Sequence, residues 1–123
     1  MSKVKRKLTT ILATDCVGFS KRMDENEELT LENLKACRSI IDPQIKEFGG
    51  RIFYTAGDSV IAEFESPVEC VNAAIGFQKA INDRNNTLPE ESQLDWRVGI
   101  HLDDVIIEAV SYTHLTLPTT VSV

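Results

Sequence analysis

Apolar and polar residues follow two different periods along the chain, which predicts a fold of helices and strands. Apolar residues recur every three or four positions over about residues 27–48, the spacing of a helix with one buried face. Pro43 lies inside this stretch, lacks an N–H and clashes with the preceding turn. We therefore expect a break there, with Asp42 capping a second short helix. Gly49 and Gly50 end the helical region.

Shorter β-prone runs flank this region and predict the strands of a sheet. They cover residues 8–14, 51–55, 59–64 and 94–100. Ala56-Gly57-Asp58 is short enough to be the turn of a hairpin. After residue 100, the chain is expected to turn at residues 102–104 and to continue as a strand at 105–107.

A third helical region follows the hairpin and has a clear start. Ser66 is the expected cap, Pro67 the first helical residue and Glu69 the partner that completes a capping box. The helix is expected to run to about residue 82 and to bury Cys70, Val71, Ala74, Ile75, Phe77 and Ile81. The resulting order β-α-α-β-β-α-β predicts a ferredoxin-like α/β sandwich of the α+β class, an antiparallel sheet with its helices on one face.

Composition narrows the class of protein. The 123 residues, 42% of them hydrophobic, make one domain. No apolar run approaches the roughly 20 residues of a membrane span. The three cysteines are odd in number and far apart, which fits neither a disulfide framework nor a zinc site and favours the cytoplasm. The net charge of −6 argues against nucleic acid as a partner.

The last residues differ in character from the rest of the chain. Residues 111–123 contain no Lys, Arg, Asp or Glu, and residues 111–120 resemble the translation of a sequencing adapter. We expect residues 1–109 to be part of a domain and residues 110–123 to be a non-native tail. The alternative is an ordinary C-terminal strand.

Two acidic residues occupy positions suited to chemistry. Asp15 follows the first strand, and Asp58 lies in the hairpin turn. A ferredoxin-like sheet brings these positions to the same edge, where two carboxylates repel each other unless a cation lies between them. Mg²⁺ prefers such oxygen ligands, and Gly18 lets backbone amides approach an anion. The alternative is that both aspartates only form turns or caps.

Four motifs in order strengthen the metal interpretation. The sequence resembles class III adenylate and guanylate cyclases, especially bacterial ones, over about residues 6–108. The motifs are Asp15-x-x-Gly18-Phe19-Ser20, Gly49-Gly50-Arg51-Ile52, Thr55-x-Gly57-Asp58-Ser59-Val60-x-x-Glu63-Phe64 and Arg97-Val98-Gly99-Ile100-His101.

The resemblance implies a lyase that makes a signalling nucleotide. Asp15, Asp58 and the backbone carbonyl of Cys16 would bind two Mg²⁺ or Mn²⁺ ions. The ribose 3′-hydroxyl of ATP, or of GTP, would attack the α-phosphorus and yield the cyclic nucleotide and pyrophosphate. The active site would form between two copies in a homodimer. The nucleotide-binding residues would be Val17, Gly18, Phe19, Ser20, Tyr54 and Gly57.

Three departures from the family pattern bear on activity. Tyr54 stands where the family often has a base-binding Lys, so the choice between adenine and guanine is open. Asp103 stands where a turn glycine is usual. The family's later Asp, Asn and Arg find no match before the chain ends, so we expect the 123-residue chain alone to be poorly active or inactive.

Other functions and other roles were weighed against the cyclase hypothesis. A diguanylate cyclase would share the core, but its Gly-Gly-Asp/Glu-Glu-Phe turn is missing. A non-catalytic domain that binds nucleotide or dimerises remains open. We expect Trp96 to fill the core and His101 to be structural at a strand end. Arg51 and Arg97 are expected to be solvated or to contact a second subunit.

Overall fold

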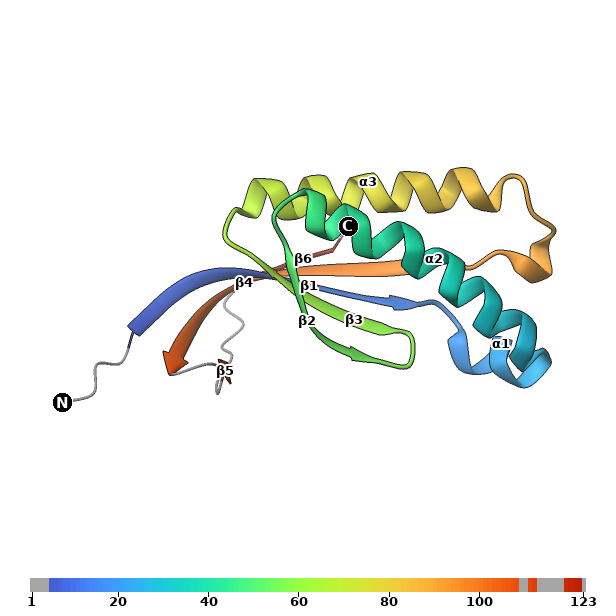
Figure 1. Ribbon diagram of the computed structural model, residues 1–123, viewed down its shortest axis with the longest axis horizontal. Coiled ribbons are helices and arrows are strands. Elements are labelled where there is room, and N and C mark those ends of the chain that lie inside the picture. The colour runs from blue at the N-terminus through green and yellow to red at the C-terminus, as the bar shows by residue number, and fades with distance from the viewer. Residues whose placement is uncertain (1–4, 109–110, 113–118, 123) are drawn as a thin grey trace.

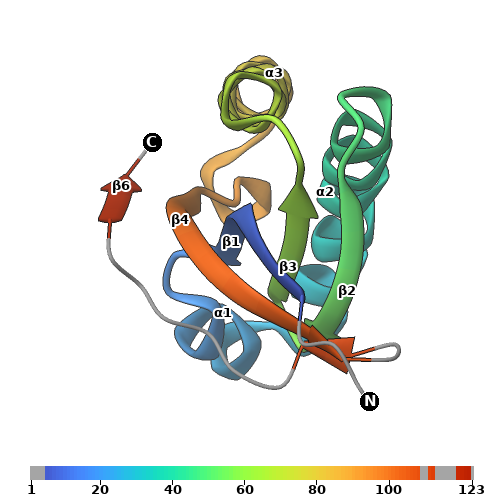
Figure 2. The same cartoon turned by 90° about the vertical axis from the view of Figure 1, so that its left-hand side faces the viewer.

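The computed structural model describes residues 5–108, 111–112 and 119–122 (Figure 1). Its elements are β1 (Lys5–Cys16), α1 (Phe19–Glu25), α2 (Glu27–Glu47), β2 (Arg51–Ala56), β3 (Ser59–Phe64), α3 (Pro67–Asn85), a 3-10 turn (Glu90–Ser92), β4 (Trp96–Glu108), β5 (Ser111–Tyr112) and β6 (Thr119–Ser122). Helices α2 and α3 lie together on one face of the sheet (Figure 2). No helix in these described ranges is long and apolar enough to cross a membrane.

The sheet has the strand order β2-β3-β1-β4, and every neighbouring pair is antiparallel. This order and the two helical crossovers confirm the predicted ferredoxin-like α+β fold. β1 is central, paired with β3 on one side and with β4 on the other. β5 and β6 both pair with β4. The proposed boundary near residue 109 stays a prediction.

The core lies between the sheet and helices α2 and α3. Side chains from β1, β3 and β4 meet the inner faces of both helices, and Leu12, Ile41, Phe64 and Phe77 are at most 1% exposed. Trp96 belongs to this core, as predicted. The prediction for α3 was wrong at Ile75, which is 54% exposed, because the helical stripe buries Ala73 and Ala74 instead.

The two helices after β1 divide at Asn26, and the predicted break at Pro43 was wrong. α2 runs without interruption through Pro43. Its true start is the Asn26 cap, whose side chain accepts a hydrogen bond from the Leu29 amide at 3.1 Å. Asp42 caps nothing and instead pairs with Arg38 one turn earlier, at 2.8 and 2.9 Å. Packing of the apolar face against the sheet and α3 outweighs the local cost of the proline.

The last predicted turn is also absent. β4 continues from Trp96 to Glu108, and Asp103 pairs with Thr9 inside a ladder that extends along all of β1. His101 therefore lies within a strand, not at its end. The long partner strand explains the error, because β1 begins at Lys5, three residues before the predicted start. At α3 the predicted start was right, with Ser66 accepting from the Glu69 amide at 3.2 Å.

Candidate metal and nucleotide site

Asp15 and Asp58 lie at the same end of the sheet. Asp15 is the penultimate residue of β1, and Asp58 lies in the turn between β2 and β3. The Cys16 amide donates a hydrogen bond to Asp58 Oδ2 at 2.9 Å. The carboxylate of Asp58 therefore reaches the peptide bond that directly follows Asp15.

Local sequence explains why the turn aims Asp58 in this way. The predicted hairpin is present, but Ala56 pairs with Ser59 and so belongs to β2, which leaves Gly57 and Asp58 as a two-residue turn. Gly57 has φ 57°, in the left-handed region that is easiest for glycine. A short connection of this kind fixes the register of the hairpin and hence the position of its turn.

Arg97, expected to be a solvated strand residue or a contact to a second subunit, lies in β4 with its side chain 70% exposed. It lies opposite Asp15 in the β1–β4 ladder and donates to both oxygens of the Asp15 carboxylate, from Nε at 2.9 Å and from a terminal nitrogen at 3.1 Å. The hydrogen bond and charge of Asp15, with a smaller contribution from Asp58, raise the pKa of Arg97. The exposure of Arg97 agrees with the expected solvated position, and its paired contact with Asp15 is a feature that sequence analysis did not predict. The contact between Arg97 and Asp15 could have been predicted from the sequence only if the register between β1 and β4 had been known.

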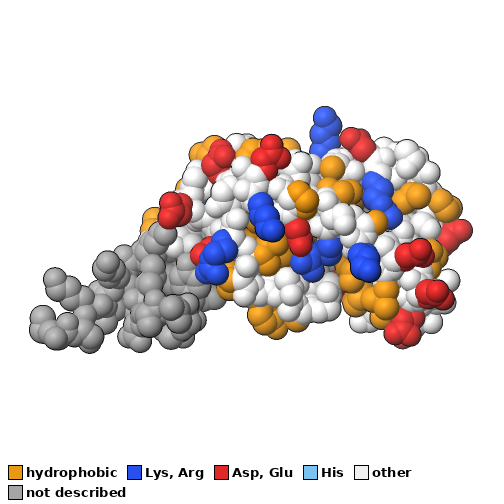
Figure 3. All heavy atoms as spheres, viewed as in Figure 1, with side chains coloured by type: hydrophobic (Ala, Val, Ile, Leu, Met, Phe, Trp, Pro, Cys, Tyr) orange, Lys and Arg blue, Asp and Glu red, His pale blue; other side chains and the backbone are white. Residues whose placement is uncertain are grey.

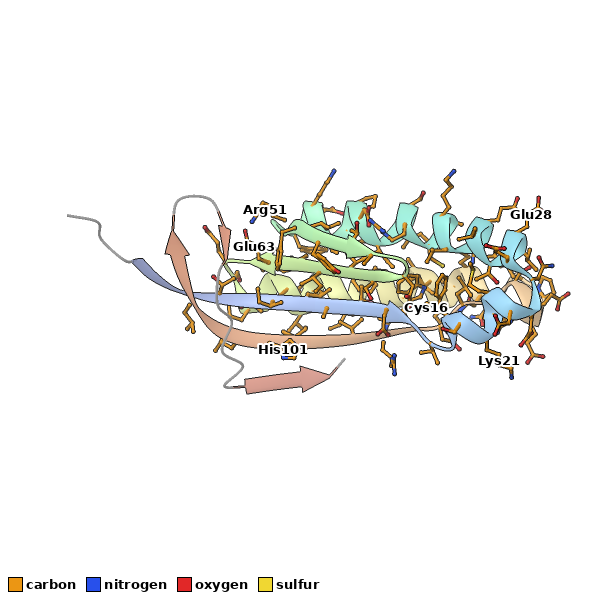
Figure 4. All side chains as sticks on the ribbon, turned by 90° about the horizontal axis from the view of Figure 1, so that it is seen from below. Cys16, Lys21, Glu28, Arg51, Glu63 and His101 are labelled. Carbon is orange, nitrogen blue, oxygen red and sulfur yellow. The ribbon has the colours of Figure 1, made fainter. Side chains whose placement is uncertain are left out.

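Cys16 connects the site to the core. Its side chain is 3% exposed and belongs to the main hydrophobic cluster. Burial, followed by the charge of Asp58, raises the pKa of its thiol to about 12, so the thiolate needed by a nucleophile is disfavoured. Figure 4 shows Cys16 where β1 approaches α1. The role predicted for its carbonyl remains a prediction.

The loop after Cys16 forms the entrance to α1. Gly18 has φ 65° and precedes the first turn of the helix. The Val17 amide already donates to the Asp95 carbonyl at 2.8 Å, so it is committed within the fold. The amides at Phe19 and Ser20 belong to a first helical turn, where backbone donors have no partner inside the helix. The predicted anion contacts are therefore better suited to these residues than to Val17.

A bulge in β2 determines where Tyr54 points. The ladder pairs Ile52 with Ala62 and then Tyr54 with Ile61, so Phe53 is an extra residue. Directly paired side chains lie on the same side of a sheet, and Ile61 pairs in turn with Ala13, two residues before Asp15. Tyr54, which is 52% exposed, therefore lies on the same open face as Asp15.

A shallow hollow of about 220 Å³ lies beside Asp15 and Arg97 on the open face. It is lined by Asp15, Arg97 and residues of β1, β3 and β4 that include Ala13, Ser59, Ile61 and Gly99. Figure 3, which has the view of Figure 1, shows charges of both signs interspersed over a side of the molecule where the sheet and its helices are seen together. Within the described ranges, no three His, Cys, Asp or Glu side chains are grouped to hold a metal ion.

The donor set nevertheless fits a Mg²⁺ ion that is shared with substrate. Mg²⁺ commonly takes one or two protein carboxylates and completes its shell with water and phosphate oxygens. Asp15 and Asp58 supply that number of carboxylates. Asp15 already accepts a cationic group, the Arg97 guanidinium, which shows that its oxygens are directed toward positive charge.

Comparison with known proteins gives the family. No family model matches the chain. A Rhizobium meliloti (strain 1021) protein provisionally named adenylate cyclase 3 is 37% identical over 106 residues, 85% of this chain and 18% of that protein. A crystal structure of an adenylate/guanylate cyclase/hydrolase from Silicibacter pomeroyi has a TM-score of 0.79 at 32% identity, over 91% of this chain and 66% of that one. The chain belongs to the class III adenylate/guanylate cyclase family.

Two further matches show how widely the fold occurs and how little of the longer relatives this chain covers. The adenylyl cyclase CyaB from P. aeruginosa shares the fold at a TM-score of 0.72 and 21% identity, over 98% of this chain and 68% of that one. Serine/threonine-protein kinase pkn2 of Myxococcus xanthus is 30% identical over 85% of this chain and 13% of the kinase. The chain thus spans less than a fifth of the length of either sequence relative.

Proposed function

We propose that the protein is a purine nucleotide cyclase that converts ATP to cyclic AMP and pyrophosphate for signalling. The observation that supports this most directly is the hydrogen bond from the Cys16 amide to Asp58, which brings the second carboxylate against the end of β1 that carries Asp15. Two carboxylates, a glycine loop and a helical first turn then border one end of the sheet. These groups are suited to holding a cation and a polyphosphate.

Each group has a defined task in this proposal. Asp15, Asp58 and the Cys16 carbonyl would hold two divalent ions, which when bound would supply charge neutralisation and activation of the ribose 3′-hydroxyl. The hydroxyl oxygen bonds to the α-phosphorus, the bond from that phosphorus to the bridging oxygen of pyrophosphate breaks, and the hydroxyl proton passes to water. The Phe19 and Ser20 amides contact the phosphates, with Gly18 allowing their close approach.

Base choice is assigned to Tyr54. Its ring lies on the open face one strand from the hollow that Asp15 borders, because its ladder partner Ile61 lines that hollow. A phenol donates or accepts one hydrogen bond without the positive charge of a lysine. GTP is therefore the second candidate substrate. The open face is also the surface on which we place the second copy of a homodimer.

The experiment measures metal and nucleotide binding before turnover. Calorimetry with Mn²⁺ and an ATP analogue is expected to show metal-dependent nucleotide binding by the 123-residue chain, and Asp15→Asn with Asp58→Asn to abolish it. Cyclic AMP and cyclic GMP are then assayed in this chain and in a version continued past residue 109 with the downstream sequence of its gene. Cyclic nucleotide from the continued version establishes the function.

The second candidate function is a non-catalytic domain that binds nucleotide or dimerises. It is favoured by one observation, the Arg97 guanidinium that already engages both oxygens of the Asp15 carboxylate. An Asp15 carboxylate that stays paired with Arg97 would leave the site without one of its two proposed metal-binding carboxylates. Nucleotide binding without turnover in the continued version would support this alternative, whereas equal turnover by both versions would contradict the expected inactivity of the chain alone.

A further inference from the structure

Arg97 occupies the carboxylate that the proposed function assigns to a metal ion. Its two hydrogen bonds engage both oxygens of Asp15, at 2.9 and 3.1 Å. At the same time the Cys16 amide engages Asp58 Oδ2. Three of the four carboxylate oxygens of Asp15 and Asp58 therefore already have a partner from the chain itself.

A divalent ion and the Arg97 guanidinium make competing demands on Asp15. Both carry positive charge, and both approach most favourably along the lone pairs of the same two oxygens. Placing them side by side on one carboxylate brings like charges within a few ångströms, which raises the free energy of the bound state. The backbone cannot relieve this conflict, because the β1–β4 register fixes Arg97 opposite Asp15.

The ion pair is weak enough to be exchanged. The side chains of Arg97 and Asp15 are 70% and 37% exposed, so water and salt screen their attraction. A long arginine side chain can also rotate into solvent without disturbing the sheet. The geometry therefore combines a specific contact with a low cost of release.

We propose that Arg97 is a displaceable counterion built into the metal site. It neutralises Asp15 when no ion is bound and releases the carboxylate when a divalent cation binds. The inference rests on the proposed metal role of Asp15 and goes beyond it, since it makes the metal affinity of the site depend on a positioning residue of β4. Removing the guanidinium is then expected to tighten metal binding.

The test compares Mn²⁺ dissociation constants, measured by the electron paramagnetic resonance signal of free Mn²⁺, for the unmodified chain and two variants. Arg97→Gln is expected to bind Mn²⁺ about two- to fivefold more tightly, the range in which exposed ion pairs contribute. Arg97→Lys keeps the charge without the paired donors and is expected to lie between. Arg51→Gln is the matched control, because it removes the same charge from the pair with Glu63 at the other end of the sheet, seen in Figure 4.

Two further measurements separate competition from a general charge effect. In an Asp15→Asn background, Arg97→Gln is expected to change Mn²⁺ affinity no more than Arg51→Gln does. In the unmodified chain, the NMR signal of the Arg97 Nε–H, assigned by its loss in Arg97→Lys, is expected to shift when Mg²⁺ is added.

The outcomes distinguish this inference from the proposed function. Unchanged or weaker Mn²⁺ binding in Arg97→Gln, or equal tightening in the Arg51→Gln control, overturns the counterion role and leaves the metal site standing. Absence of Mn²⁺ binding in the unmodified chain and all variants removes the metal assignment itself, and the counterion inference with it. If the NMR spectrum shows that Arg97→Gln does not fold, two other measurements test the counterion role. They are the Mg²⁺-induced shift of the Arg97 Nε–H signal in the unmodified chain and the Mn²⁺ affinity of Arg97→Lys.

Discussion

The two faces of the sheet use the same strands for different purposes. On the face covered by α2 and α3, β1 contributes Leu12, Thr14 and Cys16, all at most 3% exposed. On the open face the residues between them, Ala13 and Asp15, border the hollow that contains Arg97. Because side chains alternate along a strand, one ladder serves both a packed core and a polar site. Substitutions on the two faces should therefore have separable consequences.

Loss of the Asp58 charge is expected to have the largest effect and to act on the site. Asp58→Asn should lower cyclic nucleotide synthesis by the continued protein about a thousandfold, because roughly 4 kcal/mol of metal-dependent stabilisation is lost. The asparagine oxygen can still accept from the Cys16 amide, so the thermal midpoint should stay nearly constant. Enzyme assays and thermal melts measure the two effects.

Asp24→Asn is the control for the Asp58 variant, since it removes the same charge from an exposed position on α1. It should leave both the rate of cyclic nucleotide synthesis and the thermal midpoint unchanged. Near-normal turnover in Asp58→Asn would show that the metal assignment of Asp58 is wrong.

Truncation of a core side chain is expected to act mainly on the stability of the fold. Phe77 is fully buried beneath the sheet, so Phe77→Ala should lower the free energy of unfolding by about 3–5 kcal/mol. Ile75→Ala, on the exposed side of the same helix, should change it by about 0.5 kcal/mol or less. Urea denaturation followed by circular dichroism measures both, and similar losses for the two variants would contradict the separation of the faces.

Replacement of Tyr54 is expected to change substrate choice by a smaller factor. Tyr54→Phe removes one hydrogen-bonding group of about 1 kcal/mol, so the ratio of ATP to GTP turnover should change roughly fivefold. Tyr54→Lys should shift the ratio toward ATP, since the family often has lysine there. Identical ratios in all three proteins would exclude Tyr54 from base recognition.

The smallest effect is expected on the solvent side of α2. Arg38 and Asp42 form a partly exposed pair one helical turn apart, for which about 0.5 kcal/mol is typical. Arg38→Gln and Asp42→Asn should each lower stability by that amount in low salt and by less in high salt. A loss above about 1.5 kcal/mol would mean that this pair, and not core packing alone, holds α2 together across Pro43.

Much of the fold follows from local patterns, whereas the errors arise where tertiary structure overrides them. The Ser66 cap and the Gly57 turn were predictable because capping and positive φ depend on a few adjacent residues. Pro43 and Asp103 misled the prediction, because a long packed helix and a long strand ladder tolerate residues that usually end such elements. Local secondary-structure propensity predicts poorly where tertiary packing buries the segment.

The site shows the same division between local and long-range information. Asp15 and Asp58 were identifiable as candidates, since motif spacing and strand topology indicate their shared end of the sheet. The bidentate contact of Arg97 was not, because it depends on the register between segments 82 residues apart. The orientation of Tyr54 was likewise hidden, because it depends on the single extra residue, Phe53, that bulges from β2.

The central position of β1 has a consequence for synthesis on the ribosome. Cys16 meets Asp58 across 42 residues of chain, and Asp15 meets Arg97 across 82. β1 therefore emerges first, gains one partner strand when β3 has been made, and gains the other only after β4 has been made. Contacts of such long sequence separation form slowly, because the intervening chain must lose conformational entropy before the favourable strand contacts can form. A nascent polypeptide that ends between β3 and β4 already contains both Asp15 and Asp58 but lacks Arg97, so the contact that neutralises Asp15 is the last part of this end of the sheet to form.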